Sequence, residues 1–169
     1  MTQPIEHVRD AQRLDGDAYV NLFEIQFYPS GSMFICPERK VTWQGDEYDI
    51  WGLRLTGVSS SSDDETSRPK LSLANFTYTD EGEPVRGVFS AVHAQQALEG
   101  SIVIRRRVLK NNLENDVNIK EEKRWRVSRI ASETPTVITL ELRNTLDGPR
   151  FTMPARKFLP PEFAQVTLY

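Results

Sequence analysis

Apolar and polar residues alternate in several short runs of the sequence, a pattern typical of β-strands with one buried face. The run from Ala18 to Tyr28 puts Glu24 and Gln26 on one face and Asn21 on the other, together with four apolar residues: Tyr19, Phe23, Ile25 and Phe27. This run predicts a strand with one buried side. Residues 137–142 alternate more plainly and predict a strand in a sheet with one solvated face.

Further strands are predicted where apolar runs lie between turn residues. Val41–Tyr48 predicts a tight hairpin, because Gly45 can supply the positive φ that its turn requires. The other predicted strands cover residues 33–36, 50–56, 70–74, 102–109 and 124–131. Residues 59–67 hold four consecutive serines followed by three acidic residues and predict a mobile loop, and residues 111–122 predict a second polar loop.

One segment has clear helical periodicity. Residues 84–98 begin with a proline, repeat valine and phenylalanine at helical spacing, and precede Gly100, so we expect a helix there. Residues 4–14 predict a second, shorter helix. The whole pattern predicts a mainly β (α+β) fold, a small antiparallel β-barrel or sandwich with one or two helices. The predicted core includes Trp43, Tyr48, Leu71, Leu73 and Phe89.

The 169 residues suffice for one hydrophobic core, so we expect a single domain over 1–169, with a carboxy-terminal extension over 150–169. With 38% hydrophobic and 27% charged residues, a membrane-spanning segment is not expected. Cys36 is the only cysteine, which excludes an intramolecular disulfide and a cysteine-ligated cluster within the chain. The amino terminus lacks the pattern of a secretory signal, so we expect synthesis and retention in the cytoplasm, unless a larger assembly carries the chain out.

Charge is distributed unevenly along the chain, although the net charge is only −3. Residues 1–65 contain 12 acidic and 5 basic residues, whereas residues 105–129 contain 9 basic and 4 acidic residues. The molecule is therefore predicted to be electrically two-ended, which suits a subunit that stacks head to tail. A solvated pair of basic strands is the plainer interpretation.

The residues give no support for catalysis, a cofactor or a metal site. His7 and His93 are the only histidines, and we expect both to be ordinary surface or boundary residues. The chain lacks the nucleophile-elbow, phosphate-loop, dinucleotide and zinc-protease motifs. Its acidic pairs lie in segments too loose to hold two carboxylates at a hydrolytic spacing. The prediction is a protein that is not an enzyme.

The most unusual feature is a run of three arginines, Arg105, Arg106 and Arg107, within an apolar strand. Alternation places Arg105 and Arg107 on one face and Arg106 on the other, among Ile102, Ile104 and Val108. An arginine on a buried face needs a carboxylate or a partner subunit. Together with the downstream basic residues Lys123, Arg124, Arg126 and Arg129, the run could contact phosphate or acidic protein. We predict intersubunit or inter-ring contacts through Arg105, Arg106, Arg107, Arg124 and Arg126.

Several ordered motifs resemble the phage minor tail protein L family. They begin with Val41-Thr42-Trp43-Gln44-Gly45-x-x-Tyr48 and continue with Thr66-Ser67-Arg68-Pro69-x-Leu71-x-Leu73-x-Asn75. The helical stretch before Gly100 follows, and then the strands Val103-Ile104-Arg105-Arg106 and Arg124-Trp125-Arg126-Val127. The match runs from about residue 17 to residue 142.

The resemblance implies a structural virion protein with the tail hub type of fold. Such a protein would form a trimeric or hexameric ring at the tail tip, between the tube-end (distal tail) ring and the central hub or fibre protein. DNA and the tape-measure protein would pass through its lumen, and assembly would take place in the host cytoplasm. The family continues into a cysteine-rich segment that resembles an iron–sulfur domain, which this sequence does not show, so no cluster is carried over.

Two other functions stay open at this point. The first is a nucleic-acid-binding β-barrel that uses the basic strands, although such modules interleave basic residues with exposed aromatics and only Trp125 qualifies. We expect Trp125 to be packed instead. The second is a carbohydrate-binding or hydrolytic tail-associated domain, which would need an aromatic cleft with paired carboxylates. For the segment 157–163, docking on a neighbouring subunit and packing on its own domain are equally compatible with its sequence.

Overall fold

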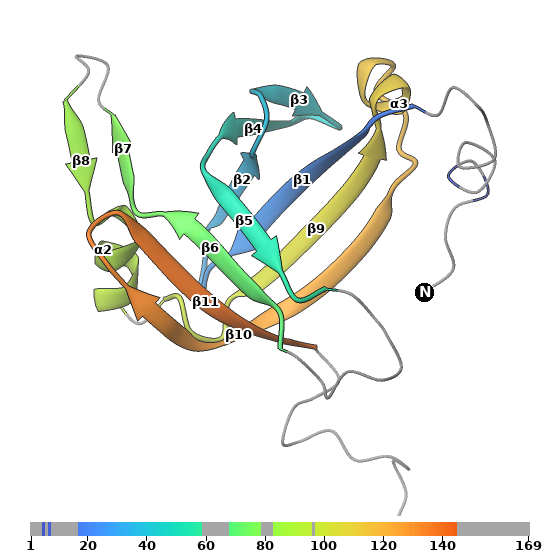
Figure 1. Ribbon diagram of the computed structural model, residues 1–169. Helices are drawn as coiled ribbons and strands as arrows, with labels where there is room; N and C mark the ends of the chain where they lie inside the picture. The colour runs from blue at the N-terminus through green and yellow to red at the C-terminus, as the bar shows by residue number, and fades with distance from the viewer. Residues whose placement is uncertain are drawn as a thin grey trace, which may run out of the picture.

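A computed structural model describes residues 5, 7, 17–58, 68–78, 83–95 and 97–144. Most of the helix predicted for residues 4–14 lies outside these residues, as do the loop predicted for 59–67 and the extension predicted for 150–169. The fold is mainly β, as predicted (Figure 1).

Nine of the strands join into one sheet. They are β1 (Tyr19–Gln26), β2 (Ser32–Cys36), β3 (Val41–Trp43), β4 (Asp46–Ile50), β5 (Leu53–Thr56), β6 (Lys70–Ala74), β9 (Ile102–Leu109), β10 (Glu121–Glu133) and β11 (Val137–Asn144). Their order in the sheet is β3-β4-β2-β1-β9-β10-β11-β6-β5. Neighbouring strands are antiparallel except β2 and β4, which run parallel. The order begins at β3 and ends at β5, so the sheet has two free edges. It is therefore open and sandwich-like rather than a closed barrel.

The sheet buries apolar side chains on both faces. Its inner face, defined by Phe23, Ile25, Val103 and Trp125, packs against β5 and β6 and forms the larger core. On the outer face, a smaller cluster packs under β3 and β4 and includes Val20, Leu22, Cys36, Trp43, Tyr48, Val108 and Leu113. The five predicted core residues are all buried. The sheet thus has two cores of unequal size.

This double burial corrects the prediction that the first strand has one buried side. In β1, Phe23 and Ile25 enter the inner core, while Leu22 and Glu24 on the opposite face are also buried. Antiparallel strands usually leave one face in water, but here β3 and β4 fold back over β1 and remove that face from solvent. The alternation therefore predicted the strand correctly, but its outer face is buried rather than solvated.

The predicted hairpin at residues 41–48 is confirmed. Val41 pairs with Tyr48 and Trp43 with Asp46, and the two turn residues Gln44 and Gly45 have φ of 55° and 86°. Positive φ at both turn positions is the geometry of a type I′ turn.

The strand predicted over residues 50–56 is in fact two strands. β4 ends at Ile50, and β5 begins at Leu53 and pairs with β6 on the other side of the sheet. Between them, the carbonyl oxygen of Gly52 accepts a hydrogen bond from the Ala74 amide at 2.8 Å. A Cβ at Gly52 would lie 3.1 Å from the Ala74 Cβ, so a side chain at this crossing would require the neighbouring strand to move by a few tenths of an ångström.

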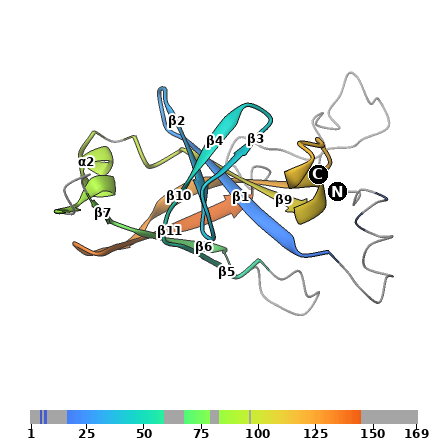
Figure 2. The same cartoon turned by 90° about the horizontal axis from the view of Figure 1, so that it is seen from above.

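The helix predicted over residues 84–98 is shorter than expected. α2 covers Val88–Ala94, while β8 (Pro84–Arg86) pairs with β7 (Phe76–Tyr78) in a separate hairpin that projects beside α2 (Figures 1 and 2). Gly87 between β8 and α2 has a φ of 76°, which interrupts any helix at that point. The predicted polar loop 111–122 is also partly wrong, because it contains most of α3 (Lys110–Glu114) and the start of β10.

Candidate functional site

Strand β9 divides its three arginines between the two faces of the sheet, as the alternation predicts. Arg105 and Arg107 pair in register with Phe23 and Asn21 of β1 and lie on the inner face. Arg106 pairs with Leu22 and lies on the outer face. Their environments therefore differ, and the run of three is not one continuous patch.

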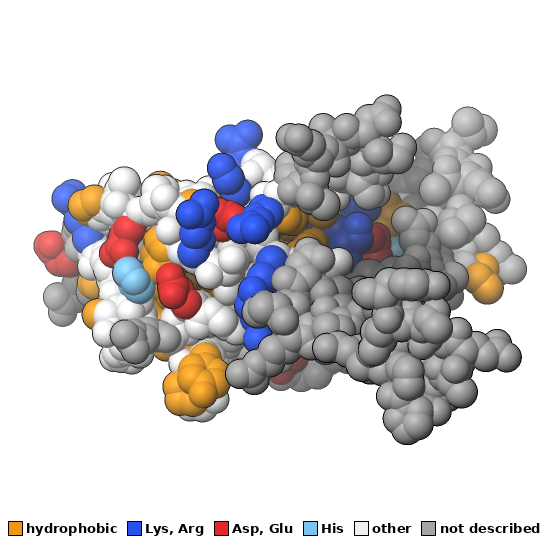
Figure 3. Space-filling model, turned by 90° about the horizontal axis from the view of Figure 1, so that it is seen from below, with side chains coloured by type: hydrophobic (Ala, Val, Ile, Leu, Met, Phe, Trp, Pro, Cys, Tyr) orange, Lys and Arg blue, Asp and Glu red, His pale blue; other side chains and the backbone are white. Residues whose placement is uncertain are grey.

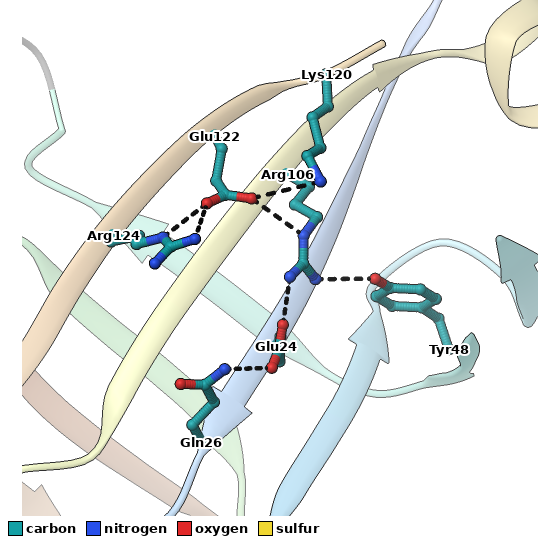
Figure 4. A network of polar contacts seen from close by, with 7 residues as sticks. All are labelled: Glu24, Gln26, Tyr48, Arg106, Lys120, Glu122 and Arg124. Atoms are coloured by element: carbon teal, nitrogen blue, oxygen red, sulfur yellow. Dashed lines mark hydrogen bonds and ion pairs between the residues drawn. The ribbon is translucent and has the colours of Figure 1, made fainter. Parts of the chain in front are cut away.

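Arg106 is the centre of a polar network beneath the β3–β4 hairpin (Figure 4). Its Nη2 forms an ion pair and hydrogen bond with the buried Glu24 carboxylate. Its Nη1 donates to the Tyr48 hydroxyl at 3.0 Å, and its Nε donates to Glu122 at 3.3 Å. Gln26 donates a further hydrogen bond to Glu24. The sequence left open whether this arginine binds a carboxylate or a partner subunit. In the structure it binds two carboxylates of its own chain, Glu24 and Glu122.

The network affects the ionisation of its members. Burial acts to lower the pKa of the Arg106 guanidinium, but hydrogen bonds to Glu24 and Tyr48 outweigh it and the pKa is raised. Burial raises the pKa of the Tyr48 hydroxyl, against the effect of the Arg106 charge. Arg106 therefore stays charged, and it fixes the hairpin to β1 and β9 through charge-assisted hydrogen bonds.

Glu122 connects this buried network to the surface. Its carboxylate accepts a hydrogen bond from Arg124 Nε at 2.6 Å and lies 3.6 Å from the Lys120 ammonium. Burial acts to raise the pKa of the Glu122 carboxyl, but the surrounding cations, above all Arg124, hold it below its usual range. Lys120 also lies 5.4 Å from the centre of the Trp43 ring, so it contacts the hairpin as well.

The two inner-face arginines stack on aromatic rings. The Arg107 guanidinium carbon lies 4.7 Å from the centre of the Tyr19 ring, and that of Arg105 lies 5.8 Å from the Trp125 ring. Burial lowers the pKa of Arg105. Trp125 itself is buried, as predicted, and is therefore not exposed for stacking on a nucleic-acid base.

The outer face of β10, β11, β6 and β5 gathers basic side chains. We call this surface the basic face; it carries Arg54, Arg68, Lys70, Arg124, Arg126, Arg129 and Arg143. All are exposed except Arg143, which is half-buried. In Figure 1, β10 and β11 run along the bottom of the fold, and the view from below shows Lys and Arg side chains on this side (Figure 3). Arg124 and Arg126 are the two predicted contact residues on this surface.

One buried carboxylate lies beneath the basic face. Glu141 of β11 forms an ion pair with Arg68 Nη1 through one oxygen and with Arg129 Nε through the other, each at 2.7 Å. These hydrogen bonds hold the pKa of the Glu141 carboxyl below its usual range. This contact explains why residue 141 is buried although alternation predicts it on the solvated face.

Acidic side chains gather at the other end of the sheet. We call this surface, formed by the β3–β4 hairpin with its flanking residues and α3, the acidic end; it carries Glu38, Asp46, Glu47, Asp49, Glu114 and Asp116. Four basic residues lie among them: Arg39, Lys40, Lys110, and Lys120, which lies against the Trp43 ring of the hairpin. In Figure 1 the β3–β4 hairpin and α3 lie at the top of the fold, whereas β10 and β11 run along the bottom. The uneven charge of the sequence thus corresponds to two surfaces of opposite charge.

Asn75 is a structurally important residue whose role the sequence patterns did not reveal. It is fully buried, and its Oδ1 accepts a hydrogen bond from the Phe89 amide at 2.8 Å. Its Nδ2 donates to Ser90 Oγ and to the Thr134 carbonyl oxygen. Gly87, at the N-cap of α2, has no side chain to cap the helix, so Asn75 does this from a distant strand connection.

The two histidines differ in environment. His7 is buried against the Tyr19 ring, which corrects the expected surface or boundary position. His93 is partly exposed and lies 2.9 Å from Glu133. Within the described ranges, no three His, Cys, Asp or Glu side chains are grouped as metal ligands. Nor does any helix in this part of the chain have the length and apolar character needed to cross a membrane.

Comparison with known proteins identifies a matching family and a solved structure with a similar fold. The model of a family described as phage minor tail protein L matches residues 29–163. A chain in the solved structure "Virion of native gene transfer agent (GTA) particle" has a similar fold, with a TM-score of 0.60 and 11% sequence identity. The similarity covers 93% of this chain and 50% of that one, so this chain spans half the length of its structural relative. At this identity, the likeness concerns the fold alone.

Proposed function

Because the chain belongs to the phage minor tail protein L family, and is thus a structural tail protein of the virion, we propose that it forms a ring at the tail tip. The ring has three or six subunits and joins the tail tube to the central fibre or receptor-binding apparatus. Its neighbours are the tube-end ring, the central hub or fibre protein, and the tape-measure protein during assembly. Its role is mechanical, with no cofactor.

The observation that carries this proposal is the pair of surfaces of opposite charge on one sheet. A subunit of a cyclic ring joins its two neighbours through two different surfaces, and surfaces of opposite charge are complementary, whereas surfaces of like charge repel one another. The basic face and the acidic end meet this requirement, and the Arg106 network holds the hairpin of the acidic end in a fixed position.

The contact residues proposed from the sequence divide into two groups. Arg124 and Arg126 are exposed on the basic face and are available to a neighbour. Arg106 already binds Glu24 and Glu122, so it supports the surface from beneath. Arg105 and Arg107 stack on aromatic rings of the inner face, and we propose that they contribute to assembly by fixing that face.

Neither alternative function gains a specific observation. Trp125, the aromatic residue that could have served a nucleic-acid interface, is buried. Of the aromatic side chains that the structure describes, only Tyr28 is exposed, which gives no aromatic platform for a carbohydrate.

The proposed role is tested by locating the chain in purified particles. We expect tryptic peptides of this chain in purified tails, and an antibody against it should label the distal end. Absence of the chain from infectious particles, or labelling along the whole tube, would contradict a tip ring.

A further inference from the structure

The basic face has more positive charge than its own chain neutralises. Arg68 and Arg129 share Glu141, and Arg124 binds Glu122. None of the ion pairs among the described residues involves the other four cations, Arg54, Lys70, Arg126 and Arg143. The surface therefore keeps a surplus of positive charge after its internal pairs are counted.

Two of these cations are placed against each other. Arg126 and Arg143 are direct cross-strand partners in the β10–β11 register. Like charges directly opposite in a sheet are destabilising, so this arrangement has a cost in the isolated molecule. An acidic surface bound over the pair would remove that cost, and this points to a partner outside the chain.

The chemistry of the face favours a protein partner over nucleic acid. Six of its seven cations are arginine and one is lysine, and protein interfaces are enriched in arginine and depleted in lysine. Nucleic-acid surfaces usually add exposed aromatic side chains for stacking, and the basic face carries none among its described residues. The acidic end on the same chain would also repel a phosphate backbone.

The same chain supplies an acidic surface of matching chemistry. Glu47 and Asp49 are exposed neighbours on one side of β4, with Glu38 exposed nearby in the sequence. Lys40 binds Glu47 at 2.6 Å and Asp49 at 3.1 Å, so one cation serves two carboxylates and a negative surplus remains.

We propose that the basic face of one copy binds the acidic end of a second copy, in a head-to-tail contact. Such a contact joins two different surfaces, so repetition with a closing rotation generates a ring. This inference rests on the proposed ring function and names its self-contact: Arg126 and Arg143 of one copy against Glu47 and Asp49 of the next. Arg54 and Lys70 extend the basic side of the contact.

The test is a charge-swap experiment on the full chain, read by sedimentation at low ionic strength. We expect the unmodified chain to self-associate, and to do so less as salt is added. Two variants, Arg126→Glu/Arg143→Glu and Glu47→Arg/Asp49→Arg, should each weaken self-association by about tenfold or more, because each brings like charges together. An equimolar mixture of the two variants should associate again, because each contact between one variant and the other joins unlike surfaces, whereas contacts between copies of the same variant stay repulsive.

A matched control separates contact from overall charge. Arg39→Glu/Lys110→Glu changes the net charge by the same amount as the basic-face variant, but on the acidic end, so it should preserve or strengthen association. The proposal is overturned if the unmodified chain is monomeric at low salt, if the mixture fails to associate, or if the control weakens association equally. Circular dichroism of each variant shows whether it is folded.

Two further readouts separate this proposal from its alternatives. If duplex DNA binds the unmodified chain and binding is lost in Arg126→Glu/Arg143→Glu, the basic face serves phosphate and the self-contact is wrong. If the chain does not self-associate but is still present in purified tails, the proposed contact between copies is wrong and the role as a tail protein is not affected. Absence from tails contradicts the function itself, whatever the chain does in solution.

Discussion

Arg126 of β10 lies directly opposite Arg143 of β11 on the basic face, so two positive charges face each other across neighbouring strands. Cross-strand pairs stabilise a sheet when their charges are opposite and destabilise it when they are alike, by about 0.2–1 kcal/mol. In the isolated chain this pair therefore opposes folding slightly. In our account, that cost is offset when a neighbouring acidic surface covers the pair.

This relationship predicts a separation of stability from assembly. Arg143→Glu should raise the free energy of unfolding of the isolated chain by up to about 1 kcal/mol, because a repulsive pair becomes an attractive one. The same variant should weaken self-association. Chemical denaturation measures the first effect and sedimentation the second.

Arg54→Glu is a suitable control, because Arg54 lies opposite Ser72 rather than another arginine. Its free energy of unfolding should change by less than about 0.5 kcal/mol. A loss of stability in Arg143→Glu would show that the opposed arginines are not strained against each other.

The Arg106 network predicts an asymmetric response to mutation. Arg106→Leu should destabilise the fold by about 3–5 kcal/mol, because it leaves the buried Glu24 carboxylate without its main partner. The double variant Glu24→Leu/Arg106→Leu should recover much of this loss, since it removes both charges. Thermal and urea denaturation of the two variants test this. Equal destabilisation by the single and double variants would contradict the account.

The capping role of Asn75 predicts a loss of local and global stability. Asn75→Ala should cost about 2–3 kcal/mol, because the amides of Phe89 and Ser90 lose their acceptor in a buried position. Ser90→Ala keeps the hydrogen bonds from both amides to Asn75 and removes only a hydroxyl that Asn75 and Glu133 contact, so it should cost less. Hydrogen exchange should show faster opening of α2 in Asn75→Ala. Unchanged exchange in α2 would refute the remote cap.

Glu141 predicts a pH dependence of stability with a definite sign. Its carboxyl pKa in the folded chain lies below the value of 4.5 for an unperturbed glutamate, because Arg68 and Arg129 donate hydrogen bonds to it. The resulting stabilisation is present above that unfolded value and is lost as the pH falls through the folded pKa. The free energy of unfolding should decrease on acidification below about pH 4.5, and Glu141→Gln should reduce this decrease. Identical pH profiles would contradict the prediction.

The alternation of apolar and polar residues predicted a strand well where the same face of that strand is buried along its whole length. It placed β9 at residues 102–109 and assigned Arg105, Arg106 and Arg107 to the correct faces. It failed where tertiary packing changed the environment of a face, as at the buried Glu24. It also failed at residues 84–86, where Gly87 ends a strand rather than continuing a helix. Both features depend on contacts with residues far away in the sequence, which a local pattern of apolar and polar residues does not reveal.

The candidate site was only partly predictable for the same reason. Arg124 and Arg126 could be identified because they belong to a local basic run. Arg54, Lys70 and Arg143 join them only through the pairing of β5, β6 and β11 with β10, which brings together residues far apart in the chain. Asn75 could be quoted as part of a family motif, but its capping function follows only from the approach of α2.

The central claim is that this protein is a ring subunit of the tail tip whose copies meet through unlike charged surfaces. Imaging of intact particles at side-chain resolution tests it most directly. Our account predicts copies of this chain in a closed ring at the distal end of the tail, with Arg126 and Arg143 of each copy against Glu47 and Asp49 of the next. A tip that lacks the chain, or a ring in which the basic face is open to solvent, would contradict it.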